Sequence, residues 1–97
     1  MFEASMNFDV ENVEPFLRQL NSELHLELPI AELVSMTRAA TIDNEVEKTV
    51  TVQFEGASIV LKYRVFIDDV DAPDLYFFTD SQPLAEAIDE QFSRFAD

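Results

Sequence analysis

The only glycine, Gly56, separates two runs of alternating apolar and polar residues, and this pattern constrains the fold more than any other feature. Apolar side chains occupy every second position in residues 48–54 and again in residues 57–67. A period of two places alternate side chains on opposite faces of a strand, and glycine permits the positive φ angle of a tight turn. The sequence therefore predicts a β-hairpin with one buried face and one outward face.

The remaining elements are indicated by helical spacing, by turn residues and by a short alternating run near the N-terminus. Asp9 or Asn12 can cap the first helix, and Pro15, which is tolerated only in the first turn of a helix, favours Asn12. Asp80 or Ser81 caps the last helix. In chain order, the predicted elements are a strand at 2–8, helices at 13–24 and 29–40, strands at 48–54, 57–67 and 75–79, and a helix that ends near residue 95.

This order, β-α-α-β-β-β-α, predicts a single α+β domain over residues 1–97. Its simplest packing is a mainly antiparallel sheet with the helices on one face. Nine Phe and two Tyr provide large units of buried area for one modest core. We therefore expect the chain, which contains no Cys, to fold without a disulfide or a metal ion.

The charge balance is extreme for a chain of this size. Twenty Asp and Glu against six Lys and Arg give a net charge of −14 at pH 7. Solubility alone needs a magnitude of only about 2 to 8 in a small domain. Like-charge repulsion excludes nucleic acid and anionic membranes as direct partners. The surplus of carboxylates therefore indicates a basic protein partner.

Residues suited to catalysis or cofactor binding are scarce. The only His, His25, stands outside any motif, and a chain without Cys has no thiolate nucleophile. One glycine cannot form a phosphate-binding loop. The acidic segment from Asp69 fails the EF-hand pattern, because its sixth and twelfth positions are Asp74 and Ser81 rather than Gly and Glu. We expect no enzyme activity, metal or cofactor, although the many carboxylates leave an acid–base pair open.

The carboxylates gather in three segments of the chain. Acidic residues alternate in residues 43–47 and again at positions 69 and 71, and alternate residues of an extended chain point to the same side, about 6.6 Å apart. Such a row can stand in for the phosphates of a nucleic-acid strand, and the last helix adds an acidic stripe. The candidate partner-binding residues are Asp43, Glu45, Glu47, Asp68, Asp69, Asp71, Asp74, Glu86, Asp89 and Glu90.

A second candidate surface is the outward side of the predicted sheet. If no helix covers this side, its aromatic side chains mark a protein interface or a homodimer contact. If the helices cover it, the same side chains form a second layer of core, and the sequence leaves both alternatives open. The side chains concerned are Val60, Lys62, Arg64 and Phe66, with either Tyr76 and Phe78 or Leu75 and Phe77 from the last strand.

In size, charge and lack of catalytic motifs, the sequence resembles the small acidic inhibitors made by phages and mobile elements. These include anti-CRISPR proteins and DNA mimics such as the uracil-DNA glycosylase inhibitor. The resemblance covers overall character and no motif, so it assigns no residue. It implies an inhibitor that occupies the nucleic-acid site of a basic protein in a host defence or repair complex.

Two other functions fit the same charge. An immunity protein or antitoxin would present an acidic face to a basic nuclease toxin, and a housekeeping interaction domain from a salt-loving organism would also be acidic. The chain has no Cys, no signal peptide at its N-terminus and no apolar run of the roughly 20 residues that a membrane span needs. These features predict a cytoplasmic protein.

Overall fold

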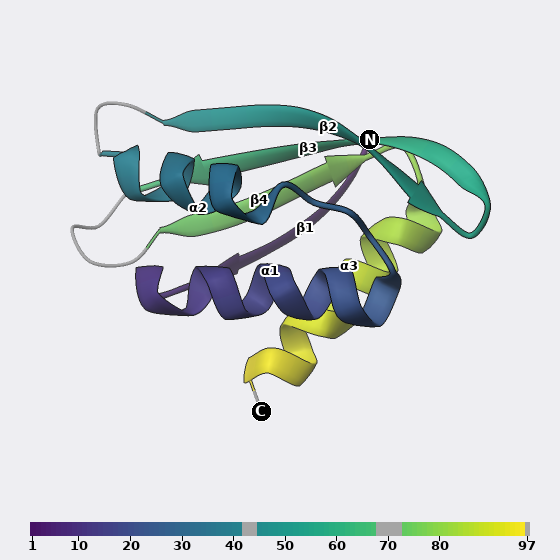
Figure 1. Ribbon diagram of the computed structural model, residues 1–97, viewed down its shortest axis with the longest axis horizontal. Coiled ribbons are helices and arrows are strands. Elements are labelled where there is room, and N and C mark those ends of the chain that lie inside the picture. The colour runs from purple at the N-terminus through teal and green to yellow at the C-terminus, as the bar shows by residue number, and fades with distance from the viewer. Residues whose placement is uncertain (42–44, 68–72, 97) are drawn as a thin grey trace.

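The computed structural model describes residues 1–41, 45–67 and 73–96. In this described part, three helices pack against one face of a four-stranded antiparallel sheet (Figure 1). The predicted α+β class, the element order and the placement of the helices on one face are therefore confirmed. The elements are β1 (Phe2–Asn7), α1 (Val10–Leu24), α2 (Ile30–Ala39), β2 (Val46–Phe54), β3 (Ala57–Phe66), β4 (Asp74–Thr79) and α3 (Gln82–Ala96).

The sheet has the strand order β1-β4-β3-β2, and each neighbouring pair is antiparallel. The predicted hairpin at Gly56 is confirmed, because Phe54 pairs with Ala57 across Glu55 and Gly56. These two turn residues have φ angles of 52° and 81°, as in the type I′ turns that match the twist of paired strands. β1 pairs with β4, so the chain crosses from one edge of the sheet to the other between β1 and β2.

The two predicted helix caps have different outcomes. Ser81 caps α3, since its Oγ accepts a hydrogen bond of 3.3 Å from a backbone N–H in the first turn. The prediction of Asn12 as the cap of α1 is wrong, because the helix begins at Val10, directly after Asp9. Pro15 therefore lies beyond the first turn. Because proline has no backbone N–H, the carbonyl four residues before Pro15 has no intrahelical donor. Pro15 is exposed, so water can donate to this carbonyl instead.

Aromatic rings connect the helices to the sheet. Phe16 in α1 and Phe92 in α3 stack with ring centroids 4.5 Å apart. Phe8, which follows β1, contacts both rings, and Phe92 also contacts Phe77 in β4. Tyr63 in β3 packs against Phe77. All five rings are buried, so the core lies between the helices and the face of the sheet that they cover.

Alternate residues of β3 separate the two faces of the sheet. Leu61, Tyr63 and Val65 are fully buried toward the helices, as the pattern predicts. Val60 and Phe66 point to the other side, where no helix of the described chain lies (Figure 1). The sheet therefore has one covered face and one face open to solvent.

Candidate functional site: the open sheet face

The uncovered side of the sheet forms one continuous surface, which we call the open face. The strand register places its side chains in rows that run across the strands. The open face consists of Glu3, Ser5 and Asn7 from β1, Asp74, Tyr76 and Phe78 from β4, Val60, Lys62, Arg64 and Phe66 from β3, and Glu47, Thr49 and Thr51 from β2.

Aromatic side chains occupy the centre of the open face. Tyr76 and Phe78 lie parallel, with ring centroids 5.8 Å apart and planes inclined by 3°. Phe66 and Val60 are 41% and 60% exposed. Both rings of β4, together with Phe66 and Arg64, line a shallow hollow of about 280 Å³. The outward pair on β4 is therefore Tyr76 and Phe78, and the patch is exposed to solvent rather than forming a second layer of core.

Two cations lie beside the rings, next to carboxylates at the β2 edge. Arg64 Nη2 donates a hydrogen bond to Oε1 of Glu45 at 2.7 Å, and Glu47 is the cross-strand neighbour of Arg64. The hydrogen bond to Glu45 and the negative charge of the Glu45 carboxylate raise the pKa of Arg64 above its ordinary value. Lys62 is the cross-strand neighbour of Phe78. The open face thus combines an aromatic centre with a charged rim, as protein-binding surfaces do.

The predicted carboxylates that the structure describes do not form one cluster. Glu45 and Glu47 lie at the β2 edge of the sheet. Glu86, Asp89 and Glu90 are exposed on α3, which packs against β1 and β4 near the opposite edge. The last helix therefore presents a separate acidic surface.

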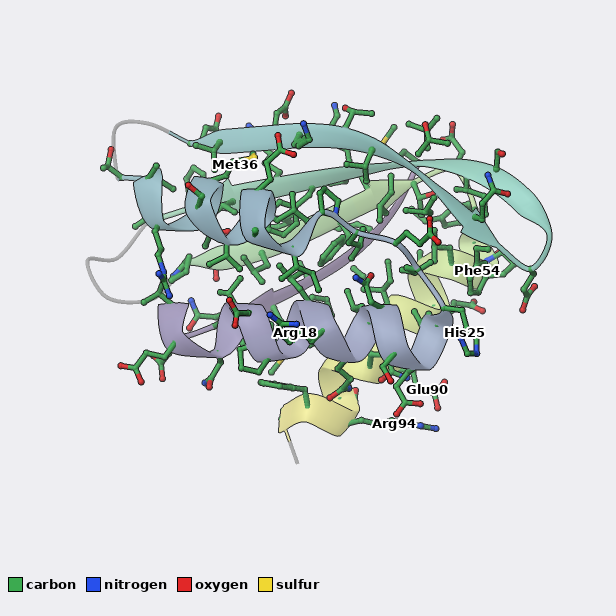
Figure 2. The ribbon with its side chains drawn as sticks, in the orientation of Figure 1. Arg18, His25, Met36, Phe54, Glu90 and Arg94 are labelled. Atoms are coloured by element: carbon green, nitrogen blue, oxygen red, sulfur yellow. The ribbon has the colours of Figure 1, made fainter. Side chains whose placement is uncertain are left out.

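Asp74 and Glu90 each have a polar partner. Asp74 begins β4 on the open face, and its Oδ1 accepts a hydrogen bond of 2.9 Å from Asn7. Glu90 forms a salt bridge of 2.8 Å with Arg94, on the side of α3 that faces away from the sheet (Figure 2). The other predicted carboxylates, Asp43, Asp68, Asp69 and Asp71, lie outside the described residues.

A further carboxylate, which the sequence reasoning missed, lies beside the acidic stripe of α3. Glu3, Glu86 and Asp89 line a hollow of about 220 Å³ between β1 and α3. Alternation placed Glu3 on the outward side of a strand, but no signal in the sequence indicated that α3 packs along this edge. Within residues 1–41, 45–67 and 73–96, no three acidic, His or Cys side chains are arranged to hold a metal ion.

Polar groups in the interior are paired with one another. Thr37 Oγ1 donates to the carbonyl of Leu33, so the Tyr63 hydroxyl donates to Thr37 at 2.7 Å. Burial raises the pKa of Tyr63 to about 12, and Thr37 acts in the opposite direction, because its hydroxyl can turn and donate to the phenolate once Tyr63 is deprotonated. In the described chain, no buried side-chain nitrogen or oxygen lacks a hydrogen-bond partner. His25 is exposed at the C-terminal end of α1 (Figure 2).

Comparison with known proteins returned no match. No protein-family model matches the chain, and neither a curated protein nor a solved structure is significantly similar to it. Function is therefore inferred from the residues and the geometry described above.

Proposed function

We propose that the protein is a non-catalytic inhibitor that binds the basic groove of a nucleic-acid-binding protein, with its surface carboxylates in place of phosphates. The target is a protein of host defence or repair, and the resemblance to small phage inhibitors makes anti-CRISPR activity the specific form of the proposal. The absence of Cys supports action in the cytoplasm. In the described chain, no helix is long and apolar enough to cross a membrane.

One observation carries this proposal: the carboxylates lie at the surface while most of the cations are already paired. In the described chain, every Asp and Glu is exposed except Glu14 and Asp74, which are partly buried. Four of the six Lys and Arg side chains form salt bridges with Glu within the molecule. The remaining negative charge is available to a basic partner and should accelerate association with it.

Two acidic surfaces are suited to this binding. The β2 edge carries Glu45 and Glu47, whose backbone positions are about 6.6 Å apart in an extended chain. The other surface is formed by Glu86 and Asp89 of α3, with Glu3 of β1 beside them. Among the described residues, Glu47, Glu86 and Asp89 take part in no salt bridge.

Affinity capture tests the proposal. The chain is immobilised, exposed to a bacterial lysate depleted of nucleic acid, and eluted either with a NaCl gradient or with duplex DNA. We expect both eluents to release the same nucleic-acid-binding protein. With that protein purified, the association rate should fall steeply between 50 and 300 mM NaCl, because the attraction is between exposed charges. Partners that DNA does not displace and salt does not release would contradict the proposal.

Matched charge variants then locate the surface. Glu45→Gln/Glu47→Gln and Glu86→Gln/Asp89→Asn each remove two negative charges from one of the two acidic surfaces. We expect at least one pair to slow association about tenfold, with a change in stability below about 0.5 kcal/mol. Glu23→Gln/Glu27→Gln removes the same charge from exposed positions near the C-terminal end of α1. If this control slows association equally, overall charge rather than either surface governs binding.

A further inference from the structure

The open face has a charge pattern that fits a second copy of itself. Two of the six Lys and Arg residues, Lys62 and Arg64, lie on it next to the outward rings of β4. We propose that two copies of the chain pack through their open faces, with a two-fold axis that runs parallel to the strands between β3 and β4. This inference does not depend on the proposed function: the dimer covers Glu47 of the β2 edge and Glu3, but it leaves Glu86 and Asp89 of α3 free for a basic partner.

The register defines which side chains such a dimer brings together. A row across the sheet contains residues that pair from β1 to β4, from β4 to β3 and from β3 to β2. One row consists of Ser5, Tyr76, Arg64 and Glu47. The next row consists of Glu3, Phe78, Lys62 and Thr49.

An axis parallel to the strands keeps each row level and exchanges its ends. β3 of one copy then lies over β4 of the other, so that Arg64 faces Tyr76 and Lys62 faces Phe78. Each cation therefore packs against an aromatic side chain of the other copy instead of against a like charge. Packed sheets keep their strands within about 30° of each other, so these neighbours remain close after the rotation that sheet twist imposes.

The outer strands are complementary in the same arrangement. β2 of one copy lies over β1 of the other, which brings Glu47 opposite the hydroxyl of Ser5 and Thr49 opposite Glu3. Each carboxylate of the two rows therefore meets a hydrogen-bond donor. No two charges of like sign face each other in these rows.

A two-fold axis across the strands gives the opposite result. When such an axis passes through the row of Arg64, Arg64 of one molecule faces Arg64 of the other, and Glu47 faces Glu47. Like charges held opposite each other across an interface disfavour the complex. The charge pattern therefore selects the axis parallel to the strands.

The size of the face and the total charge determine how such a dimer behaves. Four strands about 4.8 Å apart and about 20 Å long present roughly 400 Å² in projection. Stable interfaces bury roughly 800 Å² per partner, so we expect weak, micromolar association. Each copy carries −14, and salt screens this repulsion. Dimerisation should therefore strengthen with NaCl, whereas binding to a basic partner should weaken.

Sedimentation equilibrium at 5–500 µM chain, in 50 and in 500 mM NaCl, tests the dimer. We expect a monomer–dimer equilibrium whose dissociation constant falls at the higher salt concentration. Thr49→Lys places a cation opposite Glu3 of the second copy and should tighten the dimer about tenfold, whereas Thr49→Glu should weaken it about tenfold. Ser22→Lys and Ser22→Glu make the same charge changes on the exposed surface of α1 and should produce much smaller changes.

Thiol cross-linking tests the axis itself, since the natural chain has no Cys. Ser5→Cys and Glu47→Cys are made as two single variants, and each is treated with a bismaleimide of about 10 Å reach, alone and in an equal mixture. Packed sheets lie about 10 Å apart, so the thiols of two different variants face each other within this reach. Identical positions are about 17 Å apart, because they are also about 14 Å apart along the row. We therefore expect cross-linked dimers in the mixture and almost none from either variant alone.

Three results would overturn the proposal. The first is a chain that stays monomeric at 500 µM in both salt concentrations. The second is a dimer that responds equally to the Thr49 and Ser22 variants. The third is cross-linking by either single variant as efficiently as by the mixture. Circular dichroism of each variant shows whether it remains folded, so a loss of dimer is not confused with a loss of structure.

Discussion

The two faces of the sheet carry similar aromatic side chains but have different roles. Tyr63 of β3 and Phe77 of β4 point to the helices and are fully buried, whereas Tyr76 and Phe78 of β4 are partly exposed on the open face. On the covered face, the Tyr63 hydroxyl is hydrogen-bonded to Thr37. On the open face, two rings stack in contact with solvent. Aromatic residues therefore identify the core only once the position of the helices is known.

The largest expected effect separates adjacent rings on opposite faces. Phe77→Ala removes a fully buried ring and should lower the free energy of unfolding by about 3–5 kcal/mol. Phe78→Ala should cost less than about 1.5 kcal/mol, because part of its ring already contacts water. Urea unfolding, at protein concentrations too low for dimerisation, measures both free energies. Equal losses would mean that the open face contributes to stability as much as the covered face.

The buried hydroxyl of Tyr63 should make the stability of the covered face depend on pH. Its pKa of about 12 in the folded protein lies above the ordinary value of 10.0. The neutral hydroxyl of Tyr63 therefore contributes its full share to the free energy of unfolding below pH 10. This contribution is lost as the pH rises to about 12. The loss amounts to roughly 2–3 kcal/mol, because one pKa unit corresponds to about 1.4 kcal/mol. Urea unfolding across this alkaline range should show a smaller loss for Tyr63→Phe, and parallel curves would contradict the assignment.

A smaller effect compares two neighbours on β2. Val52 is 2% exposed on the covered face, and Thr51 is exposed on the open face. Val52→Thr buries a hydroxyl and should cost about 1–2 kcal/mol. Thr51→Val should change stability by less than about 0.5 kcal/mol, since valine suits a strand and no buried partner is lost. Chemical unfolding of the two variants side by side checks the contrast, and a reversal would mean that β2 presents the opposite face to the helices.

The smallest expected effect concerns the turn that sets the register of β2 and β3, and hence which residues belong to each face. Glu55 adopts a φ angle of 52°, which asparagine tolerates better than glutamate. Glu55→Asn should raise the free energy of unfolding by about 0.5 kcal/mol. Gly56→Ala, at a φ angle of 81°, is the opposite control and should lower it by about 1 kcal/mol. Thermal unfolding resolves both changes, and a stabilising Gly56→Ala would rule out the type I′ turn.

Much of the fold was predictable because its signals are local. The hairpin around Gly56 and the helix after Ser81 are each marked by residues within a few positions of the feature. The start of α1 was not predictable in this way, since Asp9 and Asn12 are both suitable caps. The choice depends on Phe8, which is buried and donates its backbone N–H to the carbonyl of Pro73 at 2.9 Å. This distant contact holds the end of β1, and the helix begins immediately after it.

The candidate site was predictable only in part. The outward position of Lys62 and Arg64 follows from alternation along one strand. The choice of Tyr76 and Phe78 required the register of β4, because this short strand has large apolar residues on both sides. The proximity of Glu3 to the acidic stripe of α3 required the packing of two segments from opposite ends of the chain.

The sequence by itself determined the helices and strands, the charge of −14 and the division of each strand into two sides. Only the tertiary structure decided which side of β4 the helices cover and which acidic segments become neighbours. The physical reason is that β4 carries large apolar residues on both sides, so its period of two does not distinguish them. The covered side is set by contacts between distant residues, such as the stacking of Phe16 in α1 on Phe92 in α3 and the contact of Phe92 with Phe77 in β4.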